Sequence, residues 1–67
     1  MKKRERFELI DRRADEMARS GDYEDWGSIE RALRAEGHRE ARQLLDSQFR
    51  RNELNEMCRQ ARENRRG

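Results

Sequence analysis

The chain has 67 residues, of which 48% are charged and 31% hydrophobic, and its 17 basic and 15 acidic residues leave a net charge of +2. This length predicts one domain with little room for a substrate pocket beside its own core, which argues against an enzyme and a small-molecule substrate. A single cysteine, and no apolar run approaching the roughly 20 residues of a membrane-spanning helix, favour a cytoplasmic protein without membrane contact.

The first predicted helix covers about residues 3–19. Phe7, Ile10, Ala14 and Met17 recur at helical spacing and so define one apolar face. Gly21 follows, and a glycine at this position typically ends a helix with a left-handed residue.

The second predicted helix covers about residues 25–36. Its apolar face contains Trp26, Ile29 and Leu33, spaced at i, i+3 and i+7. Asp25 is a candidate N-cap, because its carboxylate can accept hydrogen bonds from free backbone amides. Gly37 is expected to end the helix as Gly21 ends the first.

The third helical segment, about residues 39–64, has two apolar stripes on nearly opposite faces. One continuous helix would serve two surfaces, whereas a break capped by Asp46-Ser47 would start a fourth helix at about Gln48. The predicted fold is therefore an all-α, small three-helix bundle with the last helix long or broken into a fourth. The first stripe contains Ala41, Leu44, Leu45 and Phe49, and the second contains Leu54, Met57, Cys58 and Ala61.

The second stripe favours a protein-interaction module. A chain with so few large apolar residues has none to spare for a second surface unless a partner covers it, and small domains without disulfides often associate. The leading hypothesis is a non-catalytic, self-associating regulator or inhibitor that binds a larger protein. Its candidate interface residues are Tyr23, Trp26, Phe49, Arg50, Leu54, Met57, Cys58 and Ala61.

Nucleic-acid binding is the alternative hypothesis, because both ends of the chain are basic. The short turn at Gly37-His38 also joins two helices superficially like a helix-turn-helix, with Arg39 and Arg42 following it. Acidic residues interspersed with the basic ones argue against this hypothesis. Its candidate residues are Lys2, Lys3, Arg4, Arg6, Arg59, Arg62, Arg65 and Arg66.

No pattern predicts a metal site, a cofactor or a catalytic centre. His38 and Cys58 are twenty residues apart and match no zinc-ligand spacing. The acidic cluster Asp22, Glu24 and Asp25 lacks the alternating ligands and internal glycine of a calcium loop, and helix capping explains it.

The stretch DWGSIERALRAEGHREAR, residues 25–42, resembles short, arginine-rich helical proteins of uncharacterised function from bacterial and mobile-element genomes. The resemblance is compositional and transfers no site residues. It implies a small regulator or inhibitor encoded by a phage or plasmid, as one form of the binding hypothesis.

Overall fold

The computed structural model describes residues 2–66, except the side chain of Arg66, and these residues form four helices and no strand. They are α1 (Lys3–Ser20), α2 (Trp26–Ala35), α3 (Ala41–Leu44) and α4 (Gln48–Arg66). The prediction of a small all-α bundle is confirmed. Of the two alternatives for the third segment, the structure has the broken one, with a short α3 and a long α4.

Both predicted glycine caps lie in the left-handed region. Gly21 has φ 81° at the end of α1, and Gly37 has φ 97° after α2. After α2 the His38 N–H donates to the Leu33 carbonyl (3.0 Å) and the Gly37 N–H to the Arg34 carbonyl (3.0 Å). These two bonds form a Schellman motif, which satisfies carbonyls that the end of a helix leaves free.

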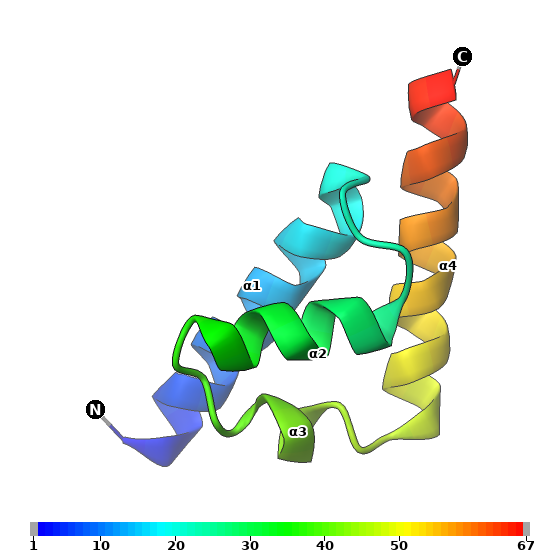
Figure 1. The fold of residues 1–67 in the computed structure, drawn as a ribbon. Helices are drawn as coiled ribbons and strands as arrows, with labels where there is room; N and C mark the ends of the chain where they lie inside the picture. Colours follow the sequence, from blue (N-terminus) through cyan, green and yellow to red (C-terminus); the bar gives the residue numbers. More distant parts are fainter. Residues whose placement is uncertain (1, 67) are drawn as a thin grey trace.

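Polar side chains cap the starts of α2 and α4. Asp25 caps α2, because its Oδ1 accepts the Ser28 N–H at 2.9 Å. At the start of α4 the Ser47 Oγ accepts the Arg50 N–H at 3.4 Å. The chain turns between α3 and α4 and then runs in a new direction (Figure 1). Capping by Ser47 therefore separates the two apolar stripes.

The long helices α1 and α4 lie side by side and run in the same direction. Near the start of α4, Arg50 Nη2 lies 2.7 Å from a carboxylate oxygen of Asp15. Near its end, Arg65 Nη1 lies 2.8 Å from Asp22 Oδ1, just beyond α1. A parallel pair needs a returning connection, which α2 and α3 supply by passing across the bundle (Figure 1). The start of α1 and the end of α4 consequently lie at opposite ends of a molecule 41 Å long (Figure 1).

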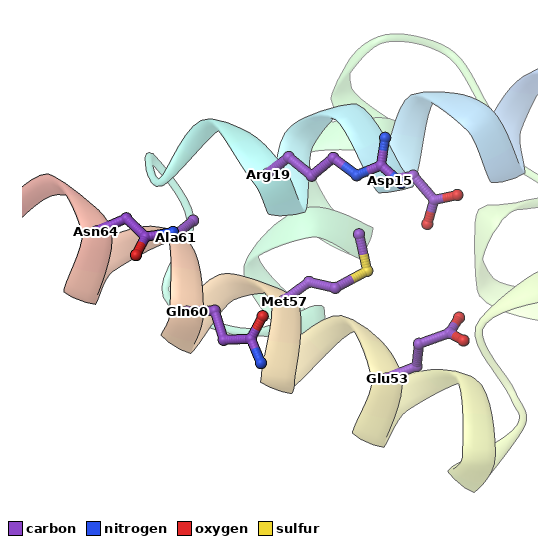
Figure 2. A pocket seen from close by; sticks show the side chains of 7 residues that line it. All are labelled: Asp15, Arg19, Glu53, Met57, Gln60, Ala61 and Asn64. Atoms are coloured by element: carbon purple, nitrogen blue, oxygen red, sulfur yellow. The ribbon is translucent and has the colours of Figure 1, made fainter.

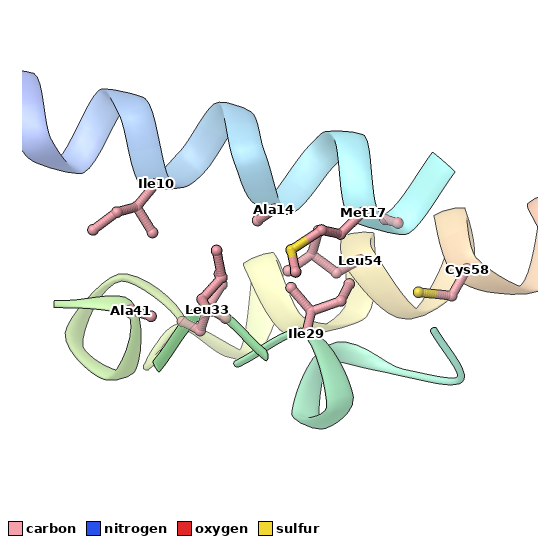
Figure 3. Packing of buried hydrophobic residues seen from close by; sticks show 10 residues of the cluster. Ile10, Ala14, Met17, Ile29, Leu33, Ala41, Leu54 and Cys58 are labelled. Carbon is pink, nitrogen blue, oxygen red and sulfur yellow. The ribbon is translucent and has the colours of Figure 1, made fainter. Parts of the chain in front are cut away.

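All four helices contribute to one apolar core (Figure 3). Each stripe of the third predicted segment reaches it, the first through Ala41 and Leu45 and the second through Leu54 and Cys58. Tyr23 and Trp26 are partly buried against its edge. The fully or almost fully buried residues are Ile10, Ala14, Met17, Ala18, Ile29, Leu33, Ala41, Leu45, Leu54 and Cys58.

Alanine at Gly21 is expected to destabilise the fold by about 1–2 kcal/mol, the usual cost of a left-handed non-glycine residue. An added Cβ would also lie 2.7 Å from Arg65 Cδ and displace that side chain. Gly27 offers a control, since it lies within α2 and its added Cβ would meet only Asp25 Oδ1 at 3.4 Å. Urea denaturation should therefore show that Gly21→Ala unfolds more readily than Gly27→Ala. Equal midpoints would contradict the assigned cap.

Candidate functional site

Two residues of the predicted protein interface are core residues. Leu54 and Cys58 have no exposed surface. The turn at residues 45–47 lets α4 direct its own stripe toward α1 and α2, so this stripe is covered by the chain itself. The assignment of Leu54 and Cys58 to a partner surface is therefore corrected.

The other apolar candidates on α4 differ in exposure. Phe49 is 78% exposed, more than any other large apolar side chain in residues 2–66. Met57 and Ala61 are half-buried and line a shallow groove between α1 and α4. Figure 2 shows the Met57 side chain extending toward α1 between polar neighbours. The residues lining this groove are Asp15, Arg19, Glu53, Met57, Gln60, Ala61 and Asn64.

Trp26 and Tyr23 are both partly buried and pack at the edge of the core. The Trp26 backbone N–H donates to Asn55 Oδ1 at 2.9 Å, which ties the start of α2 to α4. The guanidinium carbon of Arg51 lies 4.0 Å from the centroid of the Trp26 ring. This distance is that of a cation–π stack.

Arg50, another predicted interface residue, is occupied within the chain. Its side chain is 14% exposed. The Nη2 group contacts carboxylate oxygens of both Asp11 and Asp15 at 2.7 Å, and Nη1 bonds Glu53. Burial lowers the pKa of Arg50, but the Asp15 hydrogen bond and the Asp11 charge outweigh burial and raise it overall. Arg50 therefore links α4 to α1 as a permanent cation with little surface left for a partner.

The structure does not bring the two basic ends together, and it neutralises part of each. In α1, Arg6 Nη1 lies 2.8 Å from Glu40 Oε1. In α4, Arg59 pairs with carboxylates of its own helix, and Arg65 pairs with Asp22. The side chain of Arg66 lies outside the described residues. Within the described part of the chain the remaining candidates are exposed without an ion pair, and these are Lys2, Lys3, Arg4 and Arg62.

A different set of basic residues converges on one surface. Four exposed arginines, two from α2, one from the following loop and one from α3, line an open depression with Ala35. None of the ion pairs within residues 2–66 involves them. We call this surface the arginine depression, and its cations are Arg31, Arg34, Arg39 and Arg42.

Two carboxylates of the loop between α2 and α3, Glu36 and Glu40, form their ion pairs with α1 and not with the arginine depression. Glu36 bonds Arg13, with 3.0 Å between Oε2 and Nη2, and Glu40 bonds Arg6. These hydrogen bonds lower the pKa of both glutamates, so both are ionised and engaged at neutral pH. The sequence offered Arg39 and Arg42 as basic residues that could be presented after the turn, but it did not show that α2 places Arg31 and Arg34 beside them.

Cys58 and His38 are the side chains that the sequence analysis weighed for catalysis and metal binding. Burial raises the pKa of the Cys58 thiol, which keeps it protonated and unreactive at neutral pH. His38 is half-buried, with Nε2 3.8 Å from Glu36 Oε1. Among residues 2–66 no group of three His, Cys, Asp or Glu side chains is arranged to hold a metal ion. No helix described here combines the length and apolar character needed to cross a bilayer.

The chain matches no protein-family model, and it has no significant match to a curated protein or to a solved structure.

Proposed function

We propose that this chain is a small, non-catalytic nucleic-acid-binding module that contacts phosphates through the arginine depression. The observation that carries the proposal is the convergence of four guanidinium groups without a carboxylate partner among residues 2–66. Arginine presents a planar fork of donors that suits phosphate oxygens, and phosphate contacts dominate nucleic-acid affinity. The proposed setting is the bacterial cytoplasm, with a phage- or plasmid-encoded regulator as the context that the sequence resemblance favours.

Helix electrostatics account for only part of this cluster. The negative end of the α2 dipole favours a cation in the last turn, which explains Arg34. Arg42 likewise lies in the last turn of the four-residue α3, whereas Arg31 precedes the last turn of α2 and Arg39 belongs to neither helix. Elsewhere on the surface, Arg6, Arg59 and Arg65 pair with carboxylates, whereas the unpaired Arg4 and Arg62 lie apart from each other on α1 and α4. An anionic partner is the simplest reason for four adjacent arginines to remain unpaired within the described structure.

The test is fluorescence anisotropy with a labelled oligonucleotide at several salt concentrations. Affinity should fall steeply with salt, because binding releases counterions. The double variant Arg34→Gln/Arg42→Gln should bind at least tenfold more weakly, and its salt slope should fall by about one for each phosphate that it no longer neutralises. The matched control Arg4→Gln/Arg62→Gln removes the same charge from the two basic ends and should bind within twofold of the parent. Salt-insensitive binding, or a larger drop in affinity for the control, would overturn the proposal.

A protein-interaction function is the second candidate, and the exposure of Phe49 favours it. A phenylalanine that is 78% exposed near the start of α4 makes no contribution to the core and is available to a second chain. Aromatic residues are also enriched at interface hot spots. Self-association through this residue would appear in light scattering as a mass that rises with concentration and that Phe49→Ser abolishes.

A further inference from the structure

The arginine depression adjoins a second depression that is lined by different kinds of side chain. The neighbouring depression shares Arg34 and Arg42 with it, so the two form one continuous surface over α2 and α3. Trp26 and Arg51 lie in this second part, together with polar side chains. We call it the tryptophan depression, and its lining residues are Trp26, Glu30, Arg34, Arg42, Gln43, Asp46 and Arg51.

The guanidinium group of Arg51 is held in a fixed orientation in the tryptophan depression. Its guanidinium stacks on Trp26, its Nε donates to the Leu45 carbonyl at 2.7 Å, and its Nη2 lies 3.5 Å from Asp46 Oδ1. These contacts fix the plane of the guanidinium. The side chain nevertheless remains 29% exposed in the depression that it lines. A fixed guanidinium plane can stack an unpaired base, as arginine does in many RNA-binding proteins.

The polar groups around Arg51 suit a base better than a phosphate. Glu30 and Asp46 would repel a phosphate, but their carboxylates can accept hydrogen bonds from the amino and imino groups of a base edge. The Gln43 amide can both donate and accept. The arginine depression is lined only by arginines and Ala35, so it suits the phosphates of a nucleic-acid backbone. The combined surface thus places groups that suit a nucleobase beside groups that suit phosphates.

Building on the proposed function, we propose that this surface binds single-stranded nucleic acid, with phosphates on the arginine depression and one base stacked on the Arg51–Trp26 pair. A duplex would contact only the arginine depression through its phosphates, because its bases are already stacked and paired. The α2 segment between Trp26 and Ala35 is about 15 Å long, so phosphates and a splayed base of a short strand fit within its length.

The experiment compares three probes of equal length by anisotropy: oligothymidylate, an abasic strand with the same number of phosphates, and a duplex. We expect the parent chain to bind oligothymidylate at least fivefold more tightly than the abasic strand, since stacking adds affinity that phosphates do not supply. Arg51→Lys keeps the charge but removes the stacking plane, so it should lose this preference while keeping its affinity for the abasic strand. The matched control Arg62→Lys, on the exposed face of α4, should keep both.

The outcomes separate this inference from the function on which it rests. Equal affinity of the parent chain for oligothymidylate and the abasic strand would overturn base stacking and leave nucleic-acid binding intact. Tighter binding of the duplex would overturn the single-strand assignment in the same way. Competition by polyglutamate as effective as that by oligothymidylate would reveal a general polyanion site and overturn it too. Failure to bind any of the three probes would overturn both proposals.

Circular dichroism of Arg51→Lys should match the parent, and a weaker affinity for the abasic strand in this variant would contradict the stacking role.

Discussion

Replacement of Leu54 by alanine should lower the free energy of unfolding by about 2–5 kcal/mol, the usual cost of truncating a fully buried leucine. The side chain has no exposed surface and lies between α1 and α2 in the core. A domain of this size has a total stability on the order of 3–10 kcal/mol, so the variant should be close to unfolded at room temperature or melt far below the parent. Thermal and urea denaturation followed by circular dichroism measure the change.

The matched variant is Phe49→Ala, on the exposed first turn of α4. It should leave the melting temperature nearly unchanged, because the ring makes no contact with the buried cluster. If the chain self-associates, this variant should change the mass seen in light scattering, whereas Leu54→Ala should change stability. A stable, fully folded Leu54→Ala chain with reduced association would contradict the core assignment and restore Leu54 to an interface.

The second large effect is expected for Arg50→Ala. Arg50 joins α4 to α1 through Asp11 and Asp15, and it also donates to the Asp11 carbonyl at 3.2 Å. Hydrogen bonds to charged groups contribute about 1.5–3 kcal/mol each when both partners are ordered, and partial exposure of the aspartates reduces this value. We expect the free energy of unfolding to fall by about 1–3 kcal/mol overall.

Arg59→Ala is the control for Arg50→Ala, because the ion pairs of Arg59 in the described structure join it to Glu56 and Glu63 of its own helix. All three of these side chains are more than half exposed, so salt and solvent screen the pairs, and removing them should not separate any helices. Urea denaturation at low and high salt should therefore show a large, nearly salt-independent effect for Arg50→Ala and little effect for Arg59→Ala. Equal midpoints for both variants would show that the packing of α1 on α4 does not depend on Arg50.

Local features of this chain were predictable because their causes are local. The caps at Gly21, Asp25 and Gly37 depend on backbone conformation and on hydrogen bonds within a few residues. The helical spacing of Ile10, Ala14 and Met17 likewise indicated the buried face of α1. The all-α class followed from these patterns.

What covers each apolar stripe depends on the path of the whole chain. The sequence showed that the Ala41–Phe49 and Leu54–Ala61 stripes could not share one face of a straight helix, but it left open whether a partner or the chain itself covered the second. In the structure the chain itself covers the second stripe, because the turn capped by Ser47 lets α4 pack alongside α1 and bury Leu54 and Cys58.

The candidate site was hidden from the sequence for the same reason. Arg31 and Arg34 come from α2, and Arg42 comes from α3, so their proximity depends on how the loop after Gly37 folds back. The pairing of Glu36 and Glu40 with arginines of α1 is also tertiary, and it leaves the arginine depression without counter-charge from these two carboxylates. Helix propensity and caps are encoded over a few neighbouring residues, whereas charge clusters and buried faces arise only when distant segments meet.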